Sequence, residues 1–283
     1  MTVPALSIVI VSYNARRDLE ACLDSLAAHP PDTSHEVIVV DNASTDGSAD
    51  VAAGRAPRVR LVRQPRNTGF SAGNNAGIRA SSGELILLLN SDTLVPRGAI
   101  DTLVARLRSR PAVAAAGPRL VDGSGKVELS YGPMISPFTE PRQKALMALH
   151  QRGFGPVSWW VTRQAGRERL VDWVSGAALL VYRRDAEAVG LLDERFFLYT
   201  EDVDFCAALR ARGRQILFTP AAQITHLRGR SRAAAPAAMN AAYRRSHLAF
   251  YEKHHPAWAG ALRLYLRLKG ELPKETRDER DAR

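Results

Sequence analysis

Three short apolar runs near the start of the chain restrict its fold more than any other feature of the sequence. They are Leu6–Ser12 (LSIVIVS), Glu36–Val40 (EVIVV) and Glu84–Leu89 (ELILLL). Each is nearly continuous in apolar character, which is typical of strands covered on both faces of a sheet. Helical periodicity fills the stretches between them. The pattern therefore predicts an α/β fold in which a mostly parallel sheet is flanked by helices.

The same alternation continues along the chain. We expect further strands over Val59–Val62, Asp172–Tyr182 and Gln215–Pro220, and helices over Asn14–Ala27, Ser44–Ala53, Ser71–Ala80, Pro96–Ser109, Val203–Arg212, Ala237–His254 and Ala257–Lys269. The stretch from Val113 to about Glu168 shows no clear period. This organisation indicates one domain over residues 1–232, with halves of about 1–110 and 111–232, and a basic helical extension over 233–283.

The composition is that of an ordinary globular protein, with 283 residues of which 46% are hydrophobic. The longest apolar runs, such as Leu85–Leu89, are far shorter than the roughly 20 residues that a membrane-spanning helix needs. The start of the chain lacks the positively charged segment of a signal peptide, so we expect a cytoplasmic protein. Cys22 and Cys206 lie far apart in helical patterns, which favours two buried thiols over a disulfide.

Most of the positive charge lies in the last fifth of the chain. From Arg228 onward there are 13 Lys and Arg residues against 6 Asp and Glu, which supplies +7 of the net +10. Such a tail suits an anionic membrane surface, a phosphorylated substrate or nucleic acid. We expect no nucleic acid as a partner, because the interleaved aromatic and basic residues of nucleic-acid-binding modules are missing.

The last predicted helix, Ala257–Lys269, has a broad apolar arc with Arg263 and Arg267 opposite. That arrangement suits packing on the domain or a homodimer contact, and it also suits peripheral contact with the inner leaflet of a membrane. The preceding Lys253-His254-His255 segment is expected to be a solvated helix end.

Polar residues directly follow two of the predicted strands, at Asp41 and at Asn90-Ser91-Asp92. In parallel sheets, ligands bind at this end of the strands. A single carboxylate there is explained equally well as a helix cap. The triplet at Asn90 is harder to explain in this way, because it follows five consecutive apolar residues. Its oxygens suit Mg²⁺ or Mn²⁺ held together with a diphosphate, and His226 is a possible further ligand, although a lone histidine is more often structural.

Two further segments carry chemistry. Glu201, Asp202 and Asp204 place three carboxylates within four residues at a helix start, more than capping requires, and such crowding tunes one of them as a general base. The segment Gly69–Gly77 (GFSAGNNAG) has three glycines that permit close approach of a ligand to the backbone. It matches neither the P-loop nor the dinucleotide-binding pattern.

Six features, in their order and spacing, resemble the family-2 glycosyltransferases with the GT-A fold, and in particular the bacterial rhamnosyltransferase-like branch that builds cell-wall and surface polysaccharides. They are SIVIVSYN at 7–14, VIVVDNASTDG at 37–47, NTGFSAGNNAG at 67–77, LLLNSD at 87–92, DERFFLYTEDVDFC at 193–206, and His226. The resemblance covers about residues 5–232. It implies an inverting transferase that moves a sugar from a nucleotide-diphosphate donor to a glycan or a polyprenyl-diphosphate-linked acceptor.

The resemblance also implies a role for each matching position. Asp202 would be the catalytic base, and Asp92 and His226 would bind Mg²⁺ or Mn²⁺. The acceptor would contact Trp173, Ser175, Gly176 and Glu201. The donor would contact Ser12, Tyr13, Asn14, Asp41, Asn67, Gly69, Asn74, Asn90, Ser91, Asp92, Arg228 and Arg230.

This sequence has Asn90 where the family has the first Asp of its DXD motif, which removes one formal charge. On resemblance, dTDP-rhamnose is the favoured donor and UDP sugars come next. Trp159, Trp160 and Trp173 are candidates for stacking on sugar rings. Two other functions remain open. A non-catalytic homologue that binds sugar nucleotides or polysaccharide in an assembly complex is disfavoured by the presence of Asp202. A glycosidase would leave the nucleotide pocket unexplained.

Overall fold

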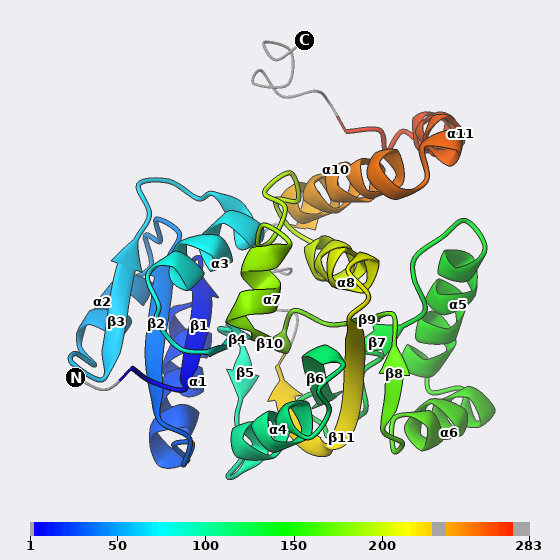
Figure 1. Ribbon diagram of the computed structural model, residues 1–283. Coiled ribbons are helices and arrows are strands. Elements are labelled where there is room, and N and C mark those ends of the chain that lie inside the picture. Colours follow the sequence, from blue (N-terminus) through cyan, green and yellow to red (C-terminus); the bar gives the residue numbers. More distant parts are fainter. Residues whose placement is uncertain (1–2, 228–235, 274–283) are drawn as a thin grey trace.

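The structure is a computed structural model that describes residues 3–227 and 236–273. Within these residues, nine strands form one main sheet (Figure 1). Their order is β3 (Val59–Arg63), β2 (His35–Asp41), β1 (Leu6–Ser12), β4 (Leu85–Asn90), β10 (Ala178–Tyr182), β6 (Val113–Val121), β11 (Gln215–His226) and β5 (Thr93–Leu94), with β8 (Arg169–Val171) also paired to β11. β3, β2, β1 and β4 are parallel, as are β6 and β11, and β10 runs antiparallel between the two groups. The predicted α/β class with a mostly parallel sheet is confirmed.

The first parallel strands end together at one edge of the sheet. Ser12 of β1 lies opposite Asp41 of β2, and Val11 of β1 lies opposite Asn90 of β4. The polar residues that follow the apolar runs are therefore neighbours in space, as expected for the ligand-binding edge of a parallel sheet.

Helices cover both faces of the sheet, because alternate residues of each buried strand point to opposite sides. Ile8 and Ile10 of β1 belong to a core that includes α1 (Arg16–Ala28), α2 (Ser48–Ala53) and α4 (Ala99–Arg108). Val9 belongs to a second core, formed with α3 (Gly69–Arg79), α7 (Arg183–Ala188) and α8 (Glu201–Ala211). Cys22 and Cys206 lie one in each core as free, buried thiols, which confirms that prediction.

The stretch predicted to be irregular, residues 113–168, is instead regularly folded. Residues 113–168 contain the central strand β6 and the helices α5 (Thr139–Gln151) and α6 (Gly155–Gln164). The sequence of β6 is VAAAGPRLV, and its small residues lack the usual strand signal. The buried residues of α5 are the polar Glu140 and His150, so this helix has no apolar stripe.

Two predicted strands differ from the structure in extent. The run Asp172–Tyr182 is split into β9 (Trp173–Val174) and β10, and β9 pairs with the short β7 (Tyr131–Gly132) in a separate sheet. The last strand was expected to end at Pro220 but continues to His226, because a register shift between Thr219 and Gln223 accommodates the proline. This extension brings His226 to the edge of the sheet where β4 ends.

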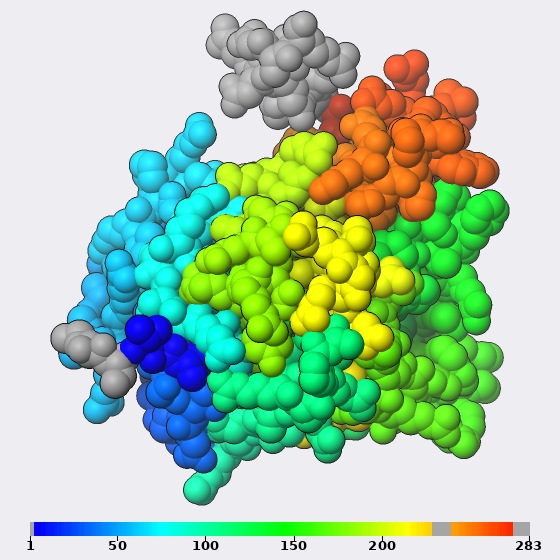
Figure 2. Space-filling view, viewed as in Figure 1, coloured from blue at the N-terminus to red at the C-terminus, as the bar shows by residue number. Residues whose placement is uncertain are grey.

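The C-terminal helices are α10 (Pro236–His254) and α11 (Pro256–Leu268), close to their predicted bounds. Phe250 and Tyr251 of α10 are buried in the second core, so α10 packs on the α/β domain. Figure 2 shows residues of α10 and α11, in orange, lying over the yellow and green parts of the chain. No helix in the described part of the chain is both long and apolar enough to cross a bilayer.

Candidate active site

Two buried polar side chains lie side by side where β1 and β2 end. The hydroxyl of Ser12 and Oδ1 of Asp41 have no hydrogen-bond partner among the described residues, although both residues are almost fully buried. Asp41 Oδ2 accepts a bond of 3.2 Å from the backbone N–H of Ser44. An unsatisfied buried polar group costs about 1–3 kcal/mol. The pair therefore has the character of a binding site for the hydroxyl or amide groups of a ligand.

The loops after β1 and β2 are tied together next to this pair. Asn14 adopts a left-handed conformation, with φ of 48°, and its Oδ1 accepts a bond of 2.8 Å from the backbone N–H of Thr45. Its own backbone N–H donates to the hydroxyl of Ser44 at 3.0 Å. Tyr13, between Asn14 and the strand, is 47% exposed. Asn14 thus shapes the rim of the site, and Tyr13 presents an aromatic ring there.

The glycine-containing segment connects the two halves of the domain. Asn67 Oδ1 accepts a bond of 3.0 Å from the backbone N–H of Gly69, and the N–H of Phe70 donates to the carbonyl of Phe197 at 2.7 Å. Asn74 is 1% exposed, and its amide donates to the Phe70 carbonyl within α3 at 2.9 Å. Asn74 therefore contributes to the packing of α3, and its side chain has no exposed surface with which to contact a nucleotide-sugar donor.

Gly69 is required by this contact. Its φ is +86°, and a Cβ atom added there would lie 2.5 Å from the carbonyl oxygen of Phe197. We expect Gly69→Ala to lower the free energy of unfolding by about 2–4 kcal/mol, combining the left-handed penalty with the steric clash. Urea denaturation measures this loss.

Gly98→Ala is the matched control. Gly98 also has a positive φ, of +71°, but a Cβ atom there would meet nothing within 4 Å. It should lose only the conformational part, about 1–2 kcal/mol. Equal losses for the two variants would mean that Gly69 does not hold the Phe197 loop in place.

A cluster of polar side chains forms where β4 and β11 end. Nε2 of His226 lies 3.2 Å from Oδ1 of Asp92 and 3.4 Å from Nδ2 of Asn90. Nδ1 of His226 lies 3.1 Å from Oε2 of Glu128. Burial disfavours the charged imidazole, but the hydrogen bonds and charges of Asp92 and Glu128 outweigh it and raise the pKa of His226 to about 9. Ser91 lies partly buried between the two strand-end residues.

This cluster fits a divalent cation shared with a ligand. No three His, Cys, Asp or Glu side chains in the described ranges form a complete metal-binding group. Asp92 offers one metal ligand, and His226 offers a second when the cation displaces its proton. Oδ1 of Asn90 is buried with no hydrogen-bond partner in the described part of the protein. Glu128 orients the histidine from behind, as carboxylates commonly do for metal-binding histidines. Mg²⁺ in particular commonly binds through one or two carboxylates and completes its shell with substrate phosphates.

Asp202 lies at the start of α8, in the second half of the domain. Its Oδ2 accepts a bond of 2.8 Å from the backbone N–H of Gly176, and its Oδ1 accepts one of 2.8 Å from that of Val203. The preceding Tyr199 and Thr200 both have positive φ angles, which turn the chain sharply into the helix. Burial raises the pKa of Asp202, while these backbone hydrogen bonds oppose the shift. Asp202 is nevertheless partly exposed to solvent.

The other two carboxylates of the cluster have different surroundings. Glu201 is 6% exposed, and burial together with the charge of Asp202 raises its pKa well above the usual range. Asp204 accepts bonds from Lys253 at 2.8 Å and His254 at 2.6 Å, which attaches α8 to α10. The prediction that Lys253 and His254 form a solvated helix end is therefore wrong, because both bind the buried Asp204.

Two consecutive loop residues connect Asp202 to the Asn90 corner. The N–H of Gly176 donates to Asp202, and the carbonyl of Ala177 accepts a bond of 2.9 Å from the backbone N–H of Asn90. Ser175, just before them, donates its N–H to the carbonyl of Ser130 at 2.8 Å. The structure thus places the candidate base and the strand-end polar triplet on opposite sides of one short loop.

The tryptophans predicted to meet sugar rings lie in different surroundings. Trp173 is 9% exposed and donates its indole N–H to the carbonyl of Pro133 at 2.9 Å, so it supports the wall beside Ser175. Trp159 and Trp160 are 62% and 39% exposed, on the surface of α6. Arg228 and Arg230 lie outside the described residues.

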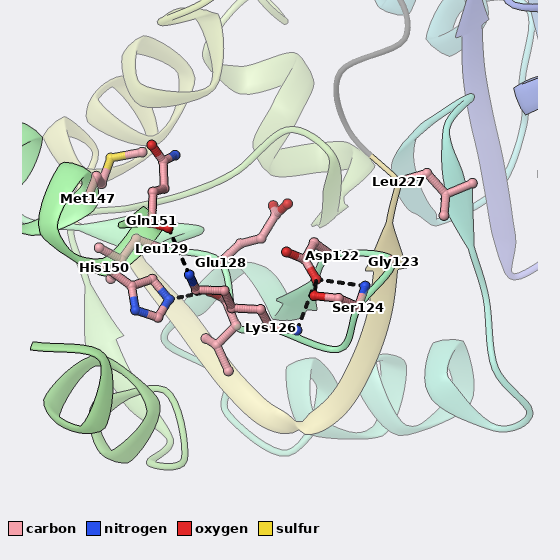
Figure 3. A pocket seen from close by; sticks show the side chains of 11 residues that line it. Asp122, Gly123, Ser124, Lys126, Glu128, Leu129, Met147, His150, Gln151 and Leu227 are labelled. Carbon is pink, nitrogen blue, oxygen red and sulfur yellow. Dashed lines mark hydrogen bonds between the residues drawn. The ribbon is translucent and has the colours of Figure 1, made fainter. Parts of the chain in front are cut away.

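A pocket of about 370 Å³ adjoins the His226 cluster (Figure 3). It lies between the turn at 122–127 and α5, with Lys126 donating to the carbonyl of Gln151 at 3.1 Å. Glu128 lines it and is drawn between these two sides, and Leu227 lies at its edge. Because Glu128 also contacts His226, the pocket is one side chain away from the candidate metal site.

Glu128 and Ser130 were missed by sequence reasoning. They lie in the stretch without periodicity, outside every recognised motif. Their position depends on pairing between segments distant in sequence, and no local signal reveals it.

The chain is similar to known proteins over most of its length. A sequence profile described as "Glycosyl transferase family 2" matches residues 7–168. The N-acetylglucosaminyl-diphospho-decaprenol L-rhamnosyltransferase of Mycobacterium tuberculosis H37Rv is 31% identical over 265 residues, which cover 89% of this chain and 86% of that protein. The O-antigen biosynthesis protein RfbC of Myxococcus xanthus is 31% identical over 80% of this chain and 18% of its own length.

Solved structures show the same fold. The mannosyltransferase PcManGT from Pyrobaculum calidifontis, in complex with GDP-Man and Mn²⁺, superposes with a TM-score of 0.62 over 93% of this chain and 69% of that one, at 19% identity. GalNAc-T7 with UDP, GalNAc and Mn²⁺ gives a TM-score of 0.59 over 80% of this chain and 44% of that one, at 15% identity.

Proposed function

The chain belongs to glycosyl transferase family 2 and has the GT-A fold, and from that premise we propose that it transfers rhamnose from dTDP-rhamnose to a glycan carried on a polyprenyl diphosphate. The similarity to the mycobacterial rhamnosyltransferase, over 89% of this chain, supports the choice of sugar and acceptor class. The geometry adds one decisive observation. The loop Gly176-Ala177 contacts a partly exposed carboxylate on one side and the strand-end triplet on the other.

We assign the two substrates to the two halves of the domain. Ser12, Asp41, Asn90 and Asp92 all belong to residues 1–110, which we propose as the donor half. Gly176 and Asp202 belong to residues 111–232, the proposed acceptor half. His226 crosses from the second half to complete the donor corner, through the long strand β11.

In the proposed reaction, Asp202 accepts the proton of the acceptor hydroxyl while that oxygen attacks the anomeric carbon of the donor sugar. The bond between this carbon and the diphosphate breaks on the opposite face, so the configuration inverts. Ser12 and Asp41 bind the nucleoside through their free polar atoms. Asp92 and His226 would hold Mg²⁺ or Mn²⁺, which supplies positive charge near the departing diphosphate.

A single available base fits sugar transfer better than it fits glycoside hydrolysis. A glycosidase needs two carboxyl groups that flank the scissile bond. Of the three carboxyls at the start of α8, Asp204 is engaged by Lys253 and His254, and Glu201 is buried with a strongly raised pKa. Asp202 remains the one that is partly exposed and held in place by backbone N–H groups.

Calorimetric binding of dTDP, UDP and GDP in the presence of Mn²⁺ tests the donor assignment. We expect dTDP to bind most tightly, and we expect rhamnose transfer from dTDP-rhamnose to a polyprenyl-diphosphate N-acetylglucosamine acceptor. Tighter binding of UDP or GDP would change the donor while leaving the transferase intact. Absence of binding by all three would overturn the donor-site assignment and favour a non-catalytic homologue that binds polysaccharide. We place this reaction at the cytoplasmic face of the membrane.

A further inference from the structure

Exposed apolar side chains gather on one part of the molecule. Thirteen large apolar residues are exposed in the described ranges, and nine of them lie in residues 138–160 or 258–268. These nine are Phe138, Leu149, Phe154, Trp159, Trp160, Trp258, Leu264, Tyr265 and Leu268. We call the surface of α5, α6 and α11 that carries them the aromatic flank. An exposed apolar cluster of this kind marks an interaction site.

The aromatic flank is continuous between the two segments. The rings of Phe138, before α5, and Trp258, in α11, are in edge-to-face contact with centroids 5.8 Å apart. Nε2 of His255 lies 2.7 Å from the carbonyl oxygen of Ile135. In Figure 1, α11, α5 and α6 follow one another down the right side of the molecule, and Figure 2 shows the same side in orange and green.

Helix α11 is apolar on the side that faces away from the protein. Ala259 and Leu266 are buried and attach the helix to the domain. Successive residues of an α-helix are rotated by about 100° around its axis. The outward side of α11 is therefore the side opposite Ala259 and Leu266. The residues on that side are Trp258, Ala261, Leu264, Tyr265 and Leu268. Leu268 is 80% exposed, so the domain does not cover this side.

The aromatic flank is also strongly cationic. Residues 138–170 and 256–269 contain nine Lys and Arg residues against two Glu. Both acids are neutralised within the protein: Glu140 binds His247 and Lys144, and Glu168 binds Arg110. Lys144 is thus paired within its own segment, and Arg263 of α11 is paired with Glu252 of α10, so the other seven cations supply the excess positive charge of the flank. Arg163 also lies over the ring of Trp159, at 5.2 Å.

We propose that the aromatic flank rests on a lipid bilayer that contains anionic headgroups. Tryptophan and tyrosine favour the membrane interface, phenylalanine and leucine suit the apolar face of interfacial helices, and long cationic side chains beside them reach the headgroups. Both classes occur together here, as in interfacial amphipathic helices. Acidic headgroups complement the excess of cations.

A second copy of the chain fits this surface less well. In a twofold dimer the same patch meets itself, so two strongly cationic surfaces would face each other. Like charges placed across an interface disfavour association. Charge complementarity therefore selects an anionic surface.

The proposal goes beyond the transfer reaction and does not depend on it. Were the acceptor lipid-linked, the position would be favourable, because Met147 and Gln151 of α5 also line the pocket beside Glu128 (Figure 3). One helix would then border both the membrane and the site.

Flotation of the full chain with vesicles tests the proposal. The protein should bind vesicles of phosphatidylcholine mixed with phosphatidylglycerol, and binding should weaken with phosphatidylcholine alone and at high ionic strength. Arg163→Glu with Arg167→Glu should reduce partitioning by about tenfold or more, given the contribution of each cation near an anionic surface. Leu264→Ser with Leu268→Ser should reduce it on both vesicle types.

Matched controls are Arg58→Glu and Val3→Ser, which alter exposed residues elsewhere and should leave partitioning unchanged. Light scattering after size-exclusion chromatography reports the oligomeric state of each variant. Failure of the wild type to bind anionic vesicles would overturn the proposal, as would equal losses in the controls. A dimer that Leu264→Ser with Leu268→Ser dissociates, without vesicle binding, would identify a second copy as the occupant. Nucleotide binding, measured separately, keeps these outcomes distinct from failure of the donor assignment.

Discussion

Asp202→Asn is expected to slow sugar transfer by about 10²–10⁴-fold, the usual contribution of a general base. The amide keeps the size of the carboxylate and can still accept the bond from the Gly176 N–H, so the loop should stay in place. It cannot take a proton from the acceptor hydroxyl. Nucleotide binding should be unchanged, because the donor groups lie on the other side of the Gly176-Ala177 loop. Product formation and calorimetry measure the two effects separately.

Glu201→Gln is the matched control for this prediction. Burial and the charge of Asp202 raise the pKa of the Glu201 carboxyl well above its usual range, which favours the neutral form, and the neutral amide is a close replacement for that form. We expect a change in rate of less than about tenfold. If Glu201→Gln were the more damaging variant, the base would have been assigned to the wrong carboxylate.

The pH profile gives a second test of Asp202. Its pKa is raised by burial, and a base must be deprotonated to act. Transfer by the wild type should therefore fall as the pH drops through this raised pKa, above the range of an ordinary aspartate. The acidic limb should disappear from the residual activity of Asp202→Asn. If the acidic limb were unchanged in Asp202→Asn, it would belong to the titration of another group.

Much of the donor half was predictable because its signals are local. The strands β1, β2 and β4 are continuous apolar runs, and each ends at a polar residue that the parallel register brings to one edge. Knowing that the strands are parallel and adjacent is then enough to place Asp41 near Ser12. Asn74 shows the limit of this reasoning, because a motif position does not reveal whether its side chain faces the cleft or its own helix.

The acceptor half was less predictable because it depends on contacts between distant segments. Glu128 approaches His226 across 98 positions of sequence, and β6 is a buried strand made of small residues. Crowding alone did not choose among the three carboxylates at the start of α8, and only the family resemblance pointed to Asp202. The structure separates them by their partners, since Asp204 binds α10, Glu201 is enclosed and Asp202 binds the Gly176 loop.

The second large effect concerns Asp92. Asp92→Ala should weaken nucleotide binding in the presence of Mn²⁺ by about 100-fold, the upper range for residues that support a metal site. When the metal is removed by EDTA, Asp92 would contribute only repulsion toward the diphosphate, so Asp92→Ala should then bind dTDP at least as tightly as the wild type. In wild type, calorimetry should show tighter binding of dTDP with Mn²⁺ than with EDTA. In Asp92→Ala, this difference in affinity should disappear.

Asn90→Asp provides the opposite change at the same corner. Oδ1 of Asn90 is buried with no hydrogen-bond partner in the ranges described, and its amide nitrogen lies 3.4 Å from His226. A carboxylate there restores the formal charge that this sequence lacks and should strengthen binding of Mn²⁺. Glu84→Gln is the control, because Glu84 lies just before the start of β4, at the opposite edge of the sheet. It should change neither the binding of Mn²⁺ nor the binding of dTDP. If dTDP bound equally well to wild type with Mn²⁺ and with EDTA, the diphosphate would be held by protein groups alone, and Asp92 and His226 would form a structural pair.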